Sequence, residues 1–105
     1  MANMTVIYKT PKDTCAFERH YFTVHVPLAK QLPGLRKYEF SKGDILSLTG
    51  HSETFFIGNL YFDSLEALKQ AFDTEIGRQC AADRKILAPN EGDVQIYVYE
   101  TDSVS

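Results

Sequence analysis

The stretch Thr54–Phe62 constrains the fold most, because it is an almost continuous apolar and aromatic run. Successive side chains of a strand point to opposite faces, so Phe55 and Ile57 point one way and Phe56 and Leu60 the other. A sheet with one face in water alternates more cleanly between apolar and polar residues. We therefore expect a sheet in which both faces carry apolar side chains.

Three further segments have the composition of strands and are bounded by turn signals. They are Met4–Tyr8, Leu35–Phe40 and Val94–Tyr99. Residues 41–52 are rich in glycine and polar side chains, which predicts a long loop or an irregular hairpin before the central strand. The chain thus supplies four strands.

Two helical segments separate these strands. After a cap at Asp13 or Thr14, apolar residues recur every three or four positions, and Pro27 should kink or end the helix near His25. The second segment opens with a capping box in which Asp63 is the expected N-cap. The order β-α-β-β-α-β is the ferredoxin-like arrangement of the α+β class. We expect two helices on one face of a four-stranded antiparallel sheet.

The helices of such a fold cover one sheet face, which leaves the apolar side chains of the other face exposed. A large exposed apolar patch usually marks a partner surface. The 105 residues, with seven phenylalanines and six tyrosines, are too few for a second domain to supply the cover. A two-fold homodimer through the open sheet face is therefore favoured. The alternative is that exposed tyrosines tolerate water.

Composition excludes several classes of protein. Eleven Lys and Arg against fourteen Asp and Glu, with no basic stripe, argue against a nucleic-acid partner. No apolar run reaches the length of a membrane span, and no signal peptide is evident. Cys15 and Cys80 lie far apart and have no metal-site spacing, which fits reduced thiols in a cytoplasmic protein. We expect no metal site and no membrane partner.

The densest group of reactive side chains lies in the first helix. His25 falls on or beside the apolar stripe that contains Phe17 and Tyr21, and His20 flanks its other edge. A histidine there can act as an acid or base near neutral pH, or can simply pack and donate one hydrogen bond. On an α-helix the two histidines would be about 140° apart, which does not suit a metal pair.

Asp83 lies on the apolar stripe of the last helix, where a buried carboxylate needs a partner. Both helices pack on the same sheet face, so Asp83 could meet a histidine or tyrosine of the first helix, or could instead be a solvated helix-end residue. Arg36, Tyr38 and Tyr61 could line a pocket between sheet and helices, or could be a structural pair and dimer contacts. The catalytic candidates are His25, His20 and Asp83, and the binding candidates are Tyr21, Phe17, Arg36, Tyr38 and Tyr61.

No nucleophile elbow, P-loop, dinucleotide fingerprint, flavin motif or haem motif is present. The sequence therefore gives no support to a hydrolase or to a nucleotide-dependent enzyme. No cofactor is expected.

Several motifs together resemble the EthD family, named after a protein of the ethyl tert-butyl ether degradation cluster. They span nearly the whole chain from Val6 to Tyr99. They are Phe17-x-x-His20-Tyr21-x-x-x-His25-x-Pro27-Leu28-Ala29, Leu32-Pro33-Gly34-Leu35-Arg36-x-Tyr38, Tyr61-Phe62-Asp63-Ser64-Leu65-Glu66-Ala67-Leu68 and Ala82-Asp83. The loop Lys42–Ser52 departs from any familiar motif.

The resemblance implies that residues 1–105 are one EthD-like domain forming a dimeric α+β barrel. It also implies a role in catabolism of xenobiotic compounds or in biosynthesis. One hypothesis is a dimer that binds an apolar or aromatic small molecule, with His25 as acid or base in a proton transfer or a cofactor-independent oxidation. The other is a non-catalytic accessory protein that supports a partner oxygenase. A cavity reached by His25 favours the first, and a filled core with inaccessible histidines the second.

Overall fold

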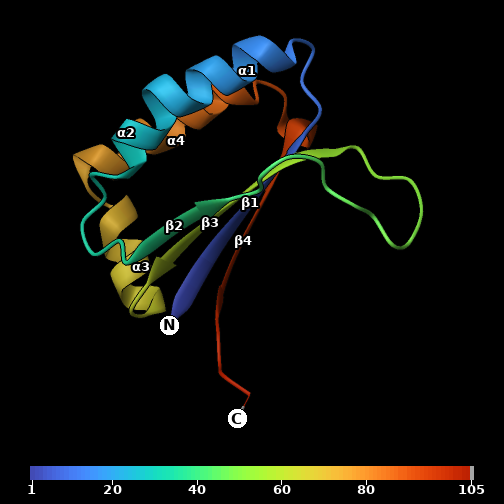
Figure 1. The fold of residues 1–105 in the computed structure, drawn as a ribbon. Coiled ribbons are helices and arrows are strands. Elements are labelled where there is room, and N and C mark those ends of the chain that lie inside the picture. The colour runs from blue at the N-terminus through green and yellow to red at the C-terminus, as the bar shows by residue number, and fades with distance from the viewer. Residues whose placement is uncertain (105) are drawn as a thin grey trace.

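The structure is a computed structural model and describes residues 1–104. Its strands and helices follow in the expected order (Figure 1). The elements are β1 (Ala2–Lys9), α1 (Thr14–His20), η1 (Tyr21–His25), α2 (Val26–Ala29), β2 (Lys37–Phe40), β3 (Thr54–Phe62), α3 (Leu65–Phe72), α4 (Glu75–Leu87), η2 (Glu91–Asp93) and β4 (Val94–Glu100).

The four strands form one antiparallel sheet in the order β2-β3-β1-β4. The two strands that follow a helix, β2 and β4, therefore lie at the edges, and β1 and β3 pair at the centre. This confirms the predicted ferredoxin-like α+β fold. The strand bounds differ from the expected ones by a few residues at most, because edge residues lack the strong apolar alternation of the centre.

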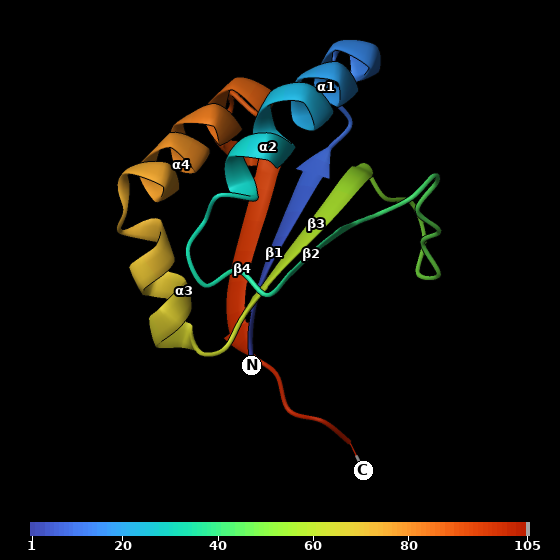
Figure 2. The same ribbon diagram turned by 60° about the vertical axis from the view of Figure 1, so that its left-hand side comes forward.

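The helices gather on one side of the sheet and leave its other side without a helix (Figures 1 and 2). Met4, Val6 and Tyr8 of β1 point toward the helices and are buried. Phe62 of β3 and Cys80 of α4 are fully buried in the same layer. The hydrophobic core therefore lies between the helices and one sheet face, and this layer also holds the acidic and histidine side chains described below.

The cap of α3 differs from the prediction. Ser64, not Asp63, is the N-cap, and its side-chain oxygen accepts a hydrogen bond from the Ala67 N–H at 3.1 Å. Asp63 instead accepts two hydrogen bonds from the Arg36 guanidinium, at 3.0 and 2.7 Å. The sequence offers two adjacent capping residues, and the arginine on the neighbouring segment decides between them.

Phe55 also departs from the expected face. The pairing of β1 with β3 shifts between Tyr8 and Lys9, which leaves Phe55 without a partner in the ladder. Such a bulge re-aims a side chain. The Phe55 ring lies 5.7 Å from that of Phe17 on the helix side, so it does not belong to the open face.

The open face still carries a set of apolar and aromatic side chains. By register with β1, its members are Ile7, Ile57, Tyr61, Tyr97 and Tyr99. Asn3 joins the strands at the centre of this face, since its side-chain amide donates to Asn59 Oδ1 at 3.2 Å and to Tyr99 Oη at 2.7 Å. The predicted two-faced sheet is thus present, and polar side chains, among them Thr5 and Asn59 at its centre, lie between the apolar ones.

Among residues 1–104, no helix has both the length and the apolar character needed to cross a membrane.

Gly77, in the first turn of α4, gives a test of how tightly α3 meets α4. A Cβ at Gly77 would lie 2.4 Å from Cα of Phe72, so the backbone would have to move. Helix propensity alone predicts that Gly77→Ala stabilises by about 1 kcal/mol, whereas the clash predicts a loss of about 1–3 kcal/mol in the free energy of unfolding. We expect the loss, measured by urea denaturation.

The matched control is Gly92→Ala, because a Cβ there meets nothing within 4 Å. Its unfolding midpoint should change little. A Gly77→Ala protein as stable as the Gly92→Ala protein would contradict the close contact between α3 and α4.

Candidate functional site

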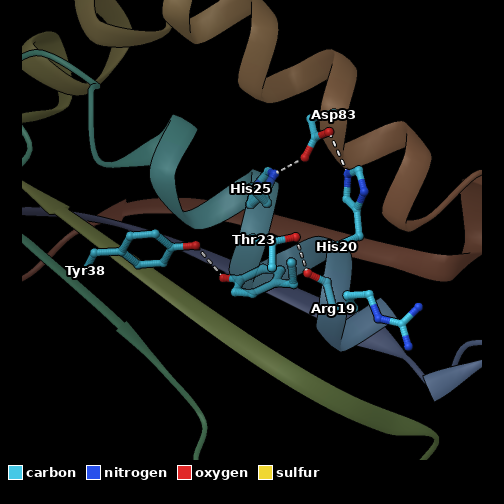
Figure 3. Close-up of polar contacts among 7 residues, drawn as sticks. Arg19, His20, Thr23, His25, Tyr38 and Asp83 are labelled. Atoms are coloured by element: carbon cyan, nitrogen blue, oxygen red, sulfur yellow. Dashed lines mark hydrogen bonds and ion pairs between the residues drawn. The ribbon is translucent and has the colours of Figure 1, made fainter. Parts of the chain in front are cut away.

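A π-helical turn shapes the helix that carries both histidines. The N–H of Val26 donates to the carbonyl of Tyr21, five residues earlier, and the Thr23 hydroxyl donates to the Arg19 carbonyl at 2.6 Å (Figure 3). Pro27 follows directly and has no N–H to donate, which favours a local change of hydrogen-bond pattern. Single π turns of this kind are frequent at functional sites.

This turn overturns the expected separation of His20 and His25 by about 140°. In a π turn the residues five apart lie one above the other, because the hydrogen bonds join positions i and i+5. The chain does not break near His25, and α1, η1 and α2 run on as one helix (Figure 1). Both imidazole rings therefore face α4.

Asp83 of α4 meets both rings (Figure 3). Its Oδ1 lies 2.7 Å from Nε2 of His20, and its Oδ2 lies 2.8 Å from Nδ1 of His25. An ionised carboxylate only accepts hydrogen bonds, so both contacting ring nitrogens carry the hydrogen. One carboxylate thus fixes the orientation and the tautomer of two histidines.

The two histidines differ in their surroundings. The His25 side chain is 8% exposed and the His20 side chain 28% exposed. Burial lowers the pKa of His25, and the hydrogen bond to Asp83 offsets this only in part. His25 is thus held neutral near neutral pH, while His20 keeps contact with solvent.

A pair of tyrosines, Tyr21 buried and Tyr38 half-buried, lies beside His25. Tyr21 from the π turn and Tyr38 from β2 share a short hydrogen bond between their hydroxyls (Figure 3). Burial raises the pKa of both, that of Tyr38 to about 12, so both are neutral phenols. Gly58 of β3 makes room for this pair, since a Cβ there would lie 3.1 Å from the Tyr21 oxygen. The void shared by these residues and His25 is about 10 Å³, which is room for about one water molecule.

A much larger pocket of about 480 Å³ opens where β1 leads into α1 and α4 leads into β4. Its lining includes the aromatic Tyr8 and Phe17, the aliphatic Ile86 and Leu87, and His20 from α1, together with charged side chains of the two loops. This volume is in the range of small-ligand sites. The pocket and the Asp83 carboxylate therefore meet at His20.

The candidate residues fall into separate places. His20, His25 and Asp83 form one cluster, and Phe17 lines the large pocket. The hydrogen-bonded pair Tyr21 and Tyr38 adjoins His25. Arg36 is an exposed partner of Asp63, and Tyr61 lies on the open sheet face with the Lys37 ammonium 5.6 Å from its ring centroid. These last two lie outside the pocket lining.

Sequence reasoning missed much of the pocket lining. The missed residues are Tyr8, Lys9, Thr10, Pro11, Lys12, Asp13, Ala16, Ile86, Leu87, Ala88, Pro89, Asn90 and Asp93. Many of them belong to the two loops marked by Pro11 and Pro89, which lie together because the topology brings the end of β1 beside the end of α4. In the sequence, the turn signals at Pro11 and Pro89 were the only indication of these two loops. Among residues 1–104, no group of three or more His, Cys, Asp and Glu is placed to hold a metal ion.

Acid is expected to destabilise the fold through His25. Because burial lowers its pKa in the folded protein, the unfolded chain takes up the proton first as the pH falls below 6.5, the ordinary value. The contribution of His25 to the free energy of unfolding is complete above that pH and is lost as the pH falls toward the folded value. Urea unfolding should therefore show a free energy of unfolding that decreases as the pH is lowered from neutral to about pH 5.

The slope should be smaller in His25→Gln and unchanged in His51→Gln, because His51 lies in an exposed loop. Equal slopes in the wild type and in His25→Gln would contradict a neutral, buried His25.

Solved structures with the same fold include an EthD family protein of Bacillus halodurans. It superposes with a TM-score of 0.86 and 29% identity, over 97% of this chain and 99% of that chain. A dimeric ferredoxin-like protein of unknown function from Thermobifida fusca gives a TM-score of 0.68 at 18% identity, over 95% and 90%. SnoaB of Streptomyces nogalater, a cofactor-independent oxygenase, gives 0.71 at 8% identity, over 98% and 94%. The last two likenesses show the fold alone.

The sequence comparisons are more specific. An uncharacterised 11.0 kDa protein in the thcB-thcC intergenic region of Rhodococcus erythropolis is 37% identical over 84 residues, which are 79% of this chain and 80% of that protein. The EthD domain model matches residues 9–88, which include both histidines and Asp83. The chain belongs to the EthD family.

Proposed function

We propose that this chain binds an apolar or aromatic small molecule in the pocket of about 480 Å³ and that His20 acts on it as acid or base. One observation carries the proposal: His20 lines the pocket and is at the same time hydrogen-bonded to Asp83. A base that touches both its substrate cavity and an orienting carboxylate is the usual arrangement for acid–base catalysis by histidine.

The hydrogen bond defines what each nitrogen does. Nε2 of His20 donates to Asp83, so Nδ1 is the nitrogen with a lone pair that can accept a proton. A proton would pass from an O–H or acidic C–H bond of the bound molecule to Nδ1, and the Asp83 carboxylate would stabilise the imidazolium that forms. In a cofactor-independent oxidation, the deprotonated molecule would then be the reductant and dioxygen the oxidant.

For His25 we propose a positioning role in place of the catalytic one that the sequence predicts. It is buried against a void of about 10 Å³, too small for a substrate. Its neutral ring holds Oδ2 of Asp83, which leaves Oδ1 aligned with His20. We therefore assign His25 as a positioning residue and His20 as the group that meets the ligand.

A homodimer through the open sheet face is part of the proposal. Ile57 and Tyr97 lie on that face, where no helix covers them (Figure 2). An apolar surface of this kind is stabilised by a self-complementary partner in a two-fold dimer. The likeness to a dimeric ferredoxin-like protein supports this assembly.

A second candidate, the non-catalytic accessory role beside a partner oxygenase, draws on the packing around His25. The interior there is filled, and His25 is buried and hydrogen-bonded. That is the arrangement expected of a structural histidine. The pocket at His20 favours ligand binding over this alternative.

Naphthol tests the pocket, because it is an apolar aromatic molecule with one ionisable hydroxyl. Wild-type protein should bind it, and Ala16→Phe should weaken binding at least about tenfold, since Ala16 lines the pocket and a ring there occupies it. His20→Gln should keep binding but should no longer accept a proton from the naphthol hydroxyl, so the bound probe should emit as the neutral naphthol. Fluorescence titration measures all three.

Ala82→Phe is the matched control, because Ala82 is also an exposed helical alanine but lies outside the lining. Equal affinity of the wild type and Ala16→Phe would contradict a ligand site in this pocket. If naphthol and related aromatic probes fail to bind the wild type at all, the accessory role is favoured.

The dimer predicts a clear effect of charge on the open face. Wild-type protein should sediment as a dimer at micromolar concentration, and Ile57→Asp should sediment as a monomer because two carboxylates would be buried in the interface. Ile86→Asp is the control, since Ile86 is 66% exposed on α4, on the helix side. A wild type that is a stable monomer would contradict the homodimer.

A further inference from the structure

The loop of residues 41–53, between β2 and β3, exposes two large apolar side chains. Leu46 is 82% exposed and Leu48 87% exposed. Loops of this length without secondary structure of their own usually have a function. Two leucines held in water at the tip of such a loop indicate a contact surface rather than a simple connection.

The two leucines alternate with less exposed residues along the loop. Exposure alternates along it, because Ile45 and Ser47 are half-buried while Leu46 and Leu48 are exposed. Residues 44–47 carry no bend, and the chain bends at residues 48–50. In an extended segment every second side chain points the same way, which matches the alternation of exposure up to the bend. Glycines with positive φ, Gly43 at 75° and Gly50 at 113°, permit the turns that begin and end the segment.

The loop projects away from the helices in both ribbon views, on the side of the open sheet face (Figures 1 and 2). Its base is fixed to the sheet, because the Thr10 N–H donates to the Glu53 carbonyl at 3.0 Å and Lys9 pairs with Glu53 at 3.5 Å. The loop therefore extends from a fixed base toward the space that a second copy of the sheet would occupy.

We propose that residues 41–53 form an arm whose Leu46 and Leu48 pack against the sheet face of a second copy of this chain. The inference rests on the proposed homodimer and adds to it the loop segment that packs against the partner chain. Two-fold symmetry makes the contact reciprocal, so that each copy gives one arm and receives one. Tyr97 and Tyr99 are the most exposed aromatic side chains of the receiving face.

The arm also joins the interface to the ligand pocket. Lys9 and Thr10, which hold Glu53 at the base of the arm, line the pocket of about 480 Å³. The base of the arm therefore adjoins one wall of that pocket.

A single tryptophan tests the arm, because the chain contains none. In Leu48→Trp, the introduced indole should emit at short wavelength and resist quenching by iodide, since the partner shields it. Adding Ile57→Asp, which breaks the dimer, should shift the emission to that of an indole in water. Lys85→Trp is the matched control, because Lys85 is exposed on α4 outside the pocket lining, and its indole should be open to iodide in both backgrounds.

A second measurement does not depend on a bulky side chain. Replacing both leucines, Leu46→Ser with Leu48→Ser, should weaken dimerisation at least about tenfold in sedimentation equilibrium, because two buried apolar side chains are lost from each arm. If the wild type is a dimer, two results overturn the arm alone: an indole at position 48 as accessible as the one at position 85, or a serine variant that dimerises as well as the wild type. A monomeric wild type overturns the homodimer itself.

Discussion

The site depends on the hydrogen bonds that the Asp83 carboxylate accepts from His20 and His25. The carboxylate lies on α4 and accepts hydrogen bonds from two histidines of the helix packed beside it, so it joins the two longest helical segments through charge as well as through apolar contact. A carboxylate in this layer would be costly without partners. With them, it fixes both rings, and the positions of the rings in turn require the π turn between Tyr21 and His25.

Two histidines divide two positions between them: one ring lies in the interior against Asp83, and the other lies at the pocket. His25 is neutral and enclosed, and it orients the carboxylate. His20 is open to a pocket that is lined by aromatic and aliphatic side chains and also by charged ones, among them Lys12 and Asp13. The Tyr21–Tyr38 pair, made possible by Gly58, closes the interior behind His25. The pocket therefore reaches one histidine only, and the packing behind His20 keeps its ring in one orientation.

Much of the fold could be predicted from local pattern. The apolar run of β3, the turn signals and the helical stripes gave the element order, because strand and helix periodicities are properties of neighbouring residues. The errors lie where a distant residue decides: Arg36 draws Asp63 away from the cap of α3, and the bulge beside Tyr8 turns Phe55 toward Phe17. The site was partly accessible, since stripe positions correctly placed Asp83 near the first helix.

The sequence by itself determined a two-faced sheet, two amphipathic helical segments and a set of histidines and a carboxylate on their inner faces, because each follows from spacing along the chain. Only the tertiary structure decided which histidine meets the pocket. A spacing of five residues, as between His20 and His25, puts two side chains far apart around the axis of an α-helix. On a π turn the same spacing puts them one above the other. That choice depends on Pro27 together with Asp83 of a helix far along the chain, and no local pattern contains both.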